Sequence, residues 1–248
     1  MNIARSIQEV TEEIVLRLSR TLQRQTGEQK LVLAGGVALN CVANGRLIRE
    51  GPFDDIWIQP AAGDAGGTIG AALAATYAQN SSRKPPDGKD GMQGTYLGPS
   101  YDDETMIACL DSHNANYRRM DDASLYQEVA GLLADDKVVG WFQGRMEFGP
   151  RALGNRSILG DARSPAMQRM LNLKIKYRES FRPFAPSVLR EDASEYFDLD
   201  TDSPYMLIVA DVREDRWCEE SDEDQARTGI GKLDVVRSDI PAVTHVDY

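Results

Sequence analysis

The sequence predicts an α/β fold divided between two domains. Two short apolar runs, residues 31–34 and 55–58, are each followed by glycines and a helical pattern, which is the order of an α/β layer. Residues 80–94 mix proline, glycine, serine and charge without periodicity, and a second alternation of helix and strand patterns follows them. A chain of 248 residues suits one large or two modest domains.

Residues 3–22 are predicted to form an amphipathic helix. Gly27 is expected to end it, since glycine is common just past a helix. Apolar side chains recur there every three or four residues, so we expect the stripe to pack on a core. The stripe comprises Ile3, Ile7, Val10, Ile14, Leu18 and Leu22.

The runs at 31–34 and 55–58 are predicted to be buried strands, because continuous apolar runs are typical of strands covered on both faces. A helix over residues 37–49 follows the first strand, and a helix rich in alanine and glycine, residues 65–78, follows the second. Asp64 stands at the start of this second helix, where an aspartate is usually an N-cap.

The Gly35-Gly36 pair lies between the first strand and its helix. Such a turn presents free N–H groups, and the helix dipole favours an anion there. A glycine pair is as often simple turn chemistry. Both interpretations stay open on the residues alone.

Beyond residue 94 the patterns predict further helices and strands. Ser100 and Asp103 resemble a capping box that starts a helix ending near Leu110. Residues 124–134 and 167–173 are predicted helices, and residues 213–239 are acidic and weakly apolar, which indicates a long excursion. Strands are expected at residues 115–120, 138–142, 185–189, 206–212 and 243–246.

Composition restricts the class of protein. The three cysteines, Cys41, Cys109 and Cys218, are far apart and odd in number, which favours a reducing cytoplasm over a disulfide framework or a zinc motif. No run of about 18 apolar residues occurs, so no membrane span is expected, and residues 1–25 show no secretory signal pattern. The net charge of −11 argues against broad binding of nucleic acid or anionic membranes.

One segment opposes this acidic balance. Residues 143–190 contain ten Lys or Arg against three Asp or Glu, interspersed with glycine and proline. Like charges repel unless an anion or an acidic partner offsets them, and arginine forks beside glycine turns suit phosphate or carboxylate recognition. The alternative is a charged surface that forms ion pairs with acidic neighbours.

Four motifs in this order resemble those of O-carbamoyltransferases of the nodulation-factor and antibiotic-tailoring type. They are LAGGVALNC at 33–41, QPAAGDAGG at 59–67, FGPRALGNRSI at 148–158 and FRPFAPS at 181–187. The resemblance implies the end of an actin-like ATPase-fold domain at residues 1–80, a linker at 81–94 and a YrdC-like α/β domain at 95–248.

The resemblance also implies an activity. The YrdC-like domain of the family is thought to make carbamoyl-adenylate from carbamoyl phosphate and ATP, with Mg accompanying ATP. The actin-like domain then passes the carbamoyl group to a hydroxyl of a small-molecule acceptor, near a divalent metal such as iron, manganese or zinc. We expect no nucleic-acid or membrane partner, and we expect self-association because an incomplete sheet leaves an open edge.

Site residues follow from placing the family motifs on this sequence. The resemblance implies that Gly35, Gly36 and Asn40 hold the nucleotide part of the intermediate, and that Asp64 is a metal ligand rather than a cap. Adenylation develops negative charge on the phosphates, which fixed cations stabilise without reorganisation. The candidate cations are Arg151, Arg156, Lys176, Arg178 and Arg182, of which Arg151, Lys176 and Arg178 are the candidate catalytic residues.

Two family signatures have no counterpart in this sequence. They are a His-x-x-x-His metal motif and a Ser-x-Asn signature that partners Lys-x-Arg, here residues 176–178. We therefore expect a fragment of the family pattern that binds nucleotide weakly and does not turn over by itself. His245 is left out of the site, because a lone histidine is more often structural.

Two other functions remain open. A nucleic-acid-binding module would use a basic face, although the acidic total and the lack of interleaved aromatics count against it. A sugar-kinase-like ATPase would follow from the first domain alone, and it gives the basic segment no role. Salt-dependent RNA retention would favour the first, and phosphate release from ATP without carbamoyl phosphate the second.

Overall fold

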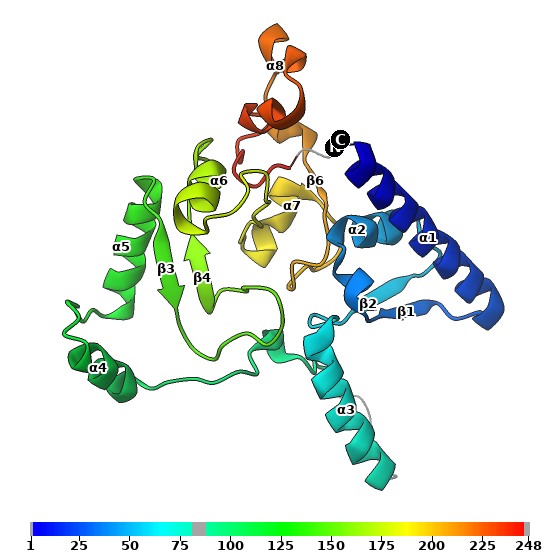
Figure 1. Cartoon of the computed structure of the whole chain (residues 1–248), viewed down its shortest axis with the longest axis horizontal. Coiled ribbons are helices and arrows are strands. Elements are labelled where there is room, and N and C mark those ends of the chain that lie inside the picture. Colours follow the sequence, from blue (N-terminus) through cyan, green and yellow to red (C-terminus); the bar gives the residue numbers. More distant parts are fainter. Residues whose placement is uncertain (1, 81–87, 246–248) are drawn as a thin grey trace. The chain divides into compact units, whose positions relative to one another are not determined.

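The computed structural model describes residues 2–80 and 88–245, so residues 81–87 of the predicted linker lie outside it. The chain divides into two compact units, and Figure 1 labels the helices and strands named below. Unit 1 is Met1–Pro99, Gly144–Asn155 and Ser203–Ala210, and unit 2 is Ser100–Gln143, Arg156–Asp202 and Asp211–Tyr248. Helices and two-stranded sheets are mixed in both units, which confirms the α/β class. Their assignment to actin-like and YrdC-like folds stays a prediction.

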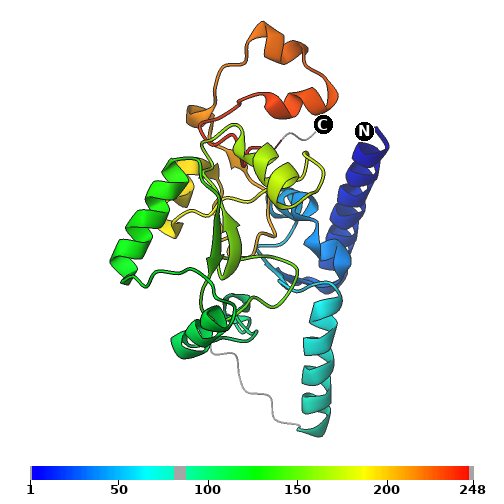
Figure 2. The ribbon, with the colours of Figure 1, turned by 60° about the vertical axis from the view of Figure 1, so that its left-hand side comes forward.

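Unit 1 is built around a pair of parallel strands. Its elements are α1 (Asn2–Thr26), β1 (Lys30–Leu33), the 3₁₀ helix η1 (Gly36–Leu39), α2 (Cys41–Glu50), β2 (Asp55–Ile58), α3 (Asp64–Gln79) and the 3₁₀ helix η2 (Gln93–Thr95). Lys30 of β1 pairs with Asp55 of β2, and the register runs in step to Leu33 and Ile58. Parallel strands need a crossover, and α2 supplies it. Figure 2 shows α1 and α2 together beside these strands.

Helix α1 exists as predicted, but it packs through a different face. Gly27, with φ 72°, ends it, and the Gly27 amide donates a hydrogen bond to the Gln23 carbonyl. Leu16, which is 1% exposed, packs with Leu31, Leu47 and Phe53. The predicted core stripe from Ile3 to Leu22 is between 44% and 78% exposed. The prediction that this stripe packs on a core is therefore wrong.

The strands of unit 1 are covered on one face only. Leu31 and Ile58 are buried, whereas their neighbours Val32 and Trp57 are 68% and 42% exposed. Side chains alternate between the two faces of a strand, and Val32 is paired with Trp57 in the register. The prediction of strands buried on both faces is wrong, because the described residues place helices against one side.

The predicted helix over residues 37–49 is divided in two. The 3₁₀ helix η1 ends at Leu39, and α2 begins anew after Asn40, whose side chain accepts from the Ala43 amide. An asparagine that satisfies an orphan N–H of a helix start is an N-cap. Asn40 therefore serves as a structural cap inside one of the family motifs.

Two segments from later in the chain complete unit 1. Residues 203–210 run close to α2, where Gly45 leaves no room for a side chain because its Cβ would lie 2.3 Å from the Val209 carbonyl oxygen. The buried Asn44 amide donates to the carbonyls of Ala38 and Leu207 at 2.8 and 2.9 Å. The 144–155 segment also packs on unit 1, because Phe148 lies against a second buried cluster that includes Ala38, Ile58 and Leu207.

Unit 2 contains short helices and two antiparallel strand pairs. Its elements are α4 (Asp103–Ser112), α5 (Asp122–Ala134), β3 (Val139–Phe142), β4 (Arg156–Leu159), α6 (Met167–Met170), the π-helix η3 (Leu171–Ile175), the 3₁₀ helix η4 (Arg190–Asp192), α7 (Ala193–Tyr196), β5 (Phe197–Asp198), β6 (Asp211–Val212), the 3₁₀ helix η5 (Glu214–Arg216), α8 (Asp222–Ala226) and the 3₁₀ helix η6 (Gly229–Asp234). β3 pairs with β4, and β5 pairs with β6. Met167, Leu171 and Ala242 form its described core cluster.

Several predictions for unit 2 need correction. The helix at Asp103 starts from Asp102, whose carboxylate accepts from the Thr105 amide, so the predicted capping box at Ser100 is wrong. Residues 115–120 and 185–189 form no strand, residues 243–245 form none either, and residue 246 lies outside the described part. Of 206–212, only β6 is a strand. β3 is half-exposed rather than buried. The predicted strands that did not form are short runs, and such runs form strands only where a neighbouring strand pairs with them.

No helix among the described residues is both long enough and apolar enough to span a membrane.

The packing of α1 generates a matched test within one helix. We expect Leu16→Ala to lower the free energy of unfolding by about 2–5 kcal/mol, because it removes a buried side chain and leaves a cavity. Ile14→Ala, at a position 51% exposed, should cost less than about 1 kcal/mol. Urea denaturation at low protein concentration measures both changes. Equal losses for the two variants would contradict the orientation of α1.

Candidate functional site

The turn after β1 has room beside its backbone. Gly35 has φ 100°, a conformation that favours glycine, and its amide donates to the Ala62 carbonyl at 2.8 Å. A Cβ at Gly35 or Gly36 would meet no atom within 4 Å. The turn is therefore tied to the segment after β2, and its exposed side is open to a ligand.

Arg151 lies against this turn. Its Nη2 donates to the Leu39 carbonyl at 3.0 Å, and its Nε is buried without a hydrogen-bond partner among the described residues. The loop that carries Arg151 approaches closely, since a Cβ at Gly149 (φ 123°) would lie 3.2 Å from the Ala61 Cβ. An unsatisfied donor on a cation is costly, so the position suits an oxygen acceptor from a ligand.

A buried carboxylate holds the Arg151 loop in shape. Glu147 is 7% exposed, and its Oε1 accepts from the Leu153 amide at 2.7 Å and from the Asn155 amide at 2.8 Å. The Asn155 side chain in turn donates to the Arg145 carbonyl at 2.7 Å. Sequence analysis missed Glu147 and Asn155. The available signal was that Glu147 is one of the three acids in the basic segment.

Asn40 is close to Arg151 in the fold, but its side chain is occupied. Besides capping α2, it donates to Gln8 Oε1 at 2.8 Å, and Gln8 Nε2 donates back to it at 3.1 Å. A nucleotide would therefore have to displace the Gln8 contact to use the Asn40 amide. The backbone of the turn is the more accessible group.

Asp64 is the first residue of α3 and is exposed. The N-cap is Gly63, with no side-chain cap, so the interpretation of Asp64 as a cap is wrong. The described residues contain no group of three or more His, Cys, Asp or Glu side chains placed to hold a metal ion. In the described part of the chain, Asp64 is therefore not joined by enough ligands to form such a site.

The Lys-x-Arg motif in unit 2 is organised by a buried asparagine. Asn172, 0% exposed, accepts from Arg178 Nε at 2.6 Å and donates to the carbonyls of Ser180 and Arg182 at 3.1 and 2.9 Å. The Arg178 guanidinium also lies 4.9 Å from the centroid of the Phe184 ring. Sequence analysis missed Asn172, although a polar residue inside an apolar helical run was a signal.

Lys176 follows the π-helix η3 and differs from Arg178 in exposure. Its amide bonds to the Leu171 carbonyl, and its side chain is exposed without a partner among the described residues. The turn is strained, because Tyr177 is a non-glycine residue with φ 49°. The Tyr177 side chain is 85% exposed. π-helical turns and left-handed residues are frequent at functional sites. The arrangement leaves one ammonium available to an anion.

The remaining candidate cations are held by their surroundings. Arg156 Nη1 donates to the Gln143 carbonyl at 2.6 Å, and its guanidinium lies 3.4 Å from the centroid of Phe142. Arg182 forms an exposed ion pair with Glu179 at 3.2 Å. The pKa of Glu179 is below its ordinary value, first because its backbone amide donates to the carboxylate and then because Arg182 does. The Arg182 guanidinium is therefore already paired with an acidic neighbour, Glu179.

The structure divides the predicted site residues between the two units. Unit 1 contains the Gly35–Gly36 turn, Asn40, Asp64 and Arg151. Unit 2 contains the other four cations, Arg156, Lys176, Arg178 and Arg182. The five cations are therefore not one cluster. Arg151 stands beside the backbone turn of unit 1, Lys176, Arg178 and Arg182 lie on the unit 2 loop that Asn172 fixes, and Arg156 lies on β4.

Comparison with protein families matches both units. A model described as Carbamoyltransferase N-terminus matches residues 1–73, and one described as Carbamoyltransferase C-terminus matches residues 130–248. The two matches lie in the order that their descriptions give, and together they cover most of the chain.

Known proteins are similar along the whole length. An uncharacterised protein from Synechocystis is 58% identical over 100% of this chain and 40% of its own length. Nodulation protein NolO of Bradyrhizobium diazoefficiens is 43% identical over 86% of this chain and 39% of its length, and nodulation protein NolNO of Sinorhizobium fredii is 40% identical over 99% and 33%. The chain thus spans at most 40% of the length of these relatives. The chain belongs to the carbamoyltransferase family.

Proposed function

We propose that this chain contributes to the transfer of a carbamoyl group to a hydroxyl of a small-molecule acceptor, through carbamoyl-adenylate made from carbamoyl phosphate and ATP. Family membership supports carbamoyl transfer in general. The adenylate route and the hydroxyl acceptor come from the resemblance of the motifs around Gly35 and Arg151. The observation that carries the proposal is the contact between Arg151 and the Gly35–Asn40 turn.

Unit 1 has the groups needed to hold a carbonyl or phosphate oxygen. The turn has open space beside Gly35 and Gly36, and the adjacent Arg151 guanidinium has a buried N–H that finds no partner among the described residues. Carbamoyl transfer builds negative charge on the carbamoyl oxygen, and a fixed cation stabilises such charge. In this proposal Arg151 orients and polarises the carbamoyl group, and the backbone of the turn holds the nucleotide.

Unit 2 has the groups needed for ATP. Carbamoyl phosphate first loses its phosphate to water, which gives carbamate and inorganic phosphate. A carbamate oxygen then attacks the α-phosphorus of ATP, the bond to the β-phosphate breaks, and the departing pyrophosphate carries the developing charge. Lys176 is exposed. Arg178 lies two residues further along the chain and is fixed by its hydrogen bond to Asn172. We assign Lys176 and Arg178 to the phosphates, with Arg156 and Arg182 as further contacts and Mg accompanying ATP. No step is assigned to the metal near Asp64, because the described residues do not complete its site.

ATP binding tests the phosphate assignment. We expect modest, salt-sensitive affinity, because exposed charges are screened. Lys176→Ala or Arg178→Ala should each weaken binding about fivefold to tenfold, which corresponds to about 1–1.4 kcal/mol. Arg213→Ala is the matched control, since Arg213 is an exposed arginine of unit 2 paired with Asp215. Isothermal titration calorimetry at two salt concentrations measures this. Equal effects of all three substitutions would contradict the assignment.

Turnover tests the activity. We expect residues 1–248 to release no pyrophosphate from ATP and carbamoyl phosphate, because losing positioning groups can remove roughly 7–11 kcal/mol of barrier lowering. The Synechocystis relative at its full length, assayed beside it, should release pyrophosphate. Robust turnover by residues 1–248 would overturn the expectation. Phosphate release without carbamoyl phosphate would favour the kinase-like ATPase, and a relative inactive with carbamoyl phosphate would contradict the proposed reaction.

Metal content tests the role of Asp64. We expect the purified chain to bind iron, manganese or zinc only substoichiometrically, because one carboxylate does not hold a cation against water. Asp64→Asn in this chain should leave the metal content unchanged, and the same substitution in the motif of a longer relative should lower it. Elemental analysis by mass spectrometry measures both. A full equivalent of metal on this chain would show that it has ligands beyond those identified.

A further inference from the structure

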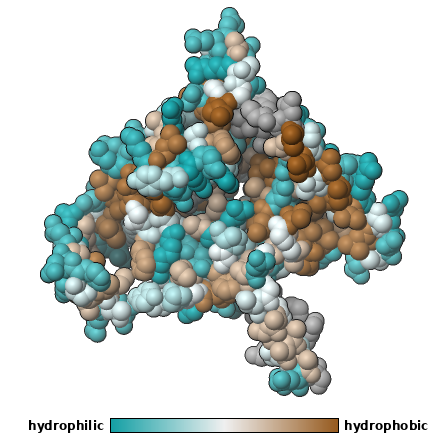
Figure 3. All heavy atoms as spheres, in the orientation of Figure 1, coloured by the Kyte–Doolittle hydropathy of each residue, from teal (hydrophilic) through white to brown (hydrophobic). Residues whose placement is uncertain are grey.

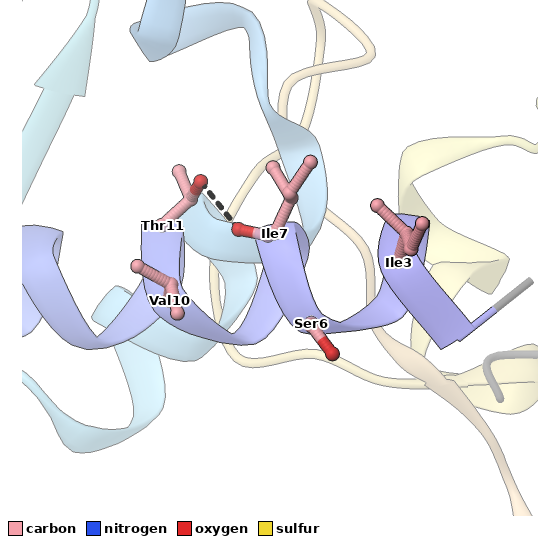
Figure 4. A pocket seen from close by; sticks show the side chains of 5 residues that line it. All are labelled: Ile3, Ser6, Ile7, Val10 and Thr11. Carbon is pink, nitrogen blue, oxygen red and sulfur yellow. Dashed lines mark hydrogen bonds between the residues drawn. The ribbon is translucent and has the colours of Figure 1, made fainter.

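Exposed apolar side chains occur in both units. In unit 1 the predicted stripe of α1 is exposed and forms a brown band along this helix (Figure 3). Ile3, Ile7 and Val10 border a hollow on the side of the helix (Figure 4). Charges of both signs occur in the same half of α1, where Arg5 pairs with Glu9. The stripe therefore does not identify a partner by its chemistry.

The most exposed of the large apolar and aromatic side chains that the structure describes is Tyr177 in unit 2, at 85%. Aromatic rings usually stabilise a fold by burying a large area. Within the described residues, the Tyr177 ring stacks on no other ring and its hydroxyl forms no hydrogen bond. The described part of the fold therefore gains little from this ring.

The backbone holds the Tyr177 ring in its exposed position. Its φ of 49° lies in the left-handed region, where a bulky residue is an outlier and glycine is not. On one side the Lys176 amide donates to the Leu171 carbonyl at 2.9 Å, and on the other the Arg178 amide donates to the Asn172 carbonyl at 3.0 Å. Glycine would form this turn with less strain, so the turn does not explain the tyrosine. Strained residues of this kind cluster at ligand-binding sites.

Cations on both sides of Tyr177 indicate what its ring binds. Lys176 is exposed without a partner among the described residues, and the Arg178 guanidinium is fixed by Asn172. Consecutive Cα atoms are about 3.8 Å apart, so one small ligand can reach all three side chains. An aromatic face beside cations suits a ligand with a flat ring and phosphates, which is the chemistry of a nucleotide. The net charge of −11 disfavours a polynucleotide.

We propose that the Tyr177 ring stacks on the base of the nucleotide whose phosphates contact Lys176 and Arg178. This inference rests on the proposed function, which supplies the assignment of those phosphates. The ring is attached to a fixed backbone and has two rotatable side-chain bonds, so it loses little conformational freedom when a base covers it. Stacking adds contact with the base and none with the phosphates. Tyr177 is therefore the residue of this loop that distinguishes a nucleotide from a plain polyphosphate.

Calorimetric titration of the whole chain with ATP and with tripolyphosphate separates the ring from the cations. We expect Tyr177→Gly to weaken ATP binding about fivefold, which corresponds to about 1 kcal/mol, and to leave tripolyphosphate binding unchanged. Glycine suits the φ of this residue, so the turn keeps its shape and the melting temperature should not fall. Tyr177→Phe keeps the ring and should bind ATP as the parent chain does. Tyr126→Ala is the control, because Tyr126 is a 55% exposed tyrosine on α5 of unit 2.

Lys176→Ala, measured with the same two ligands, distinguishes this inference from the proposed function. It should weaken both ATP and tripolyphosphate, and a variant that weakens neither would overturn the phosphate assignment and the inference together. Unchanged ATP binding by Tyr177→Gly, or equal losses for both ligands, would overturn the stacking alone. Tyr177→Phe as weak as Tyr177→Gly would overturn it as well. Tighter binding of a single-stranded oligoadenylate than of ATP would overturn the choice of a mononucleotide.

Discussion

The buried carboxylate of Glu147 is the interaction on which the unit 1 site depends. It accepts from two backbone amides of the loop that follows, and this closes the loop around Gly149 and Gly154. A carboxylate removed from water is stable only when such donors satisfy it. The closed loop packs on Ala61 and brings Arg151 to the Leu39 carbonyl. The position of Arg151 therefore depends on Glu147, which directly precedes the motif at residues 148–158.

Asn172 performs the equivalent task in unit 2 with a neutral side chain. Its amide joins the π-helix η3 to the carbonyls of Ser180 and Arg182, and its oxygen orients Arg178. A buried amide with all its bonds made specifies one loop conformation, because any other leaves it unsatisfied. Each unit thus uses one buried polar side chain to shape a basic loop. This device explains how glycine- and arginine-rich segments keep a defined shape.

Sequence patterns were reliable where the interaction is local and unreliable where it depends on partners. The helices starting at residues 2, 64 and 122 follow from periodicity, and Gly27 ends the first as expected. The predicted strand at 115–120 failed because nothing in the described part of the chain pairs with it. For α1, the spacing correctly predicted an apolar stripe but not the direction in which it faces. A second apolar face, centred on Leu16, occupies the core instead.

By itself, the sequence determined the α/β class, the positions of the main helices and the family, because these depend on local periodicity and on short motifs. Only the tertiary structure decided that Arg151 belongs with the Gly35 turn while Lys176 and Arg178 belong to unit 2. It also decided that Asn40 is a cap and that Asp64 is not. The physical reason is that hydrogen bonds between residues far apart in the chain, such as Arg151 with Leu39, leave no periodic trace in the sequence.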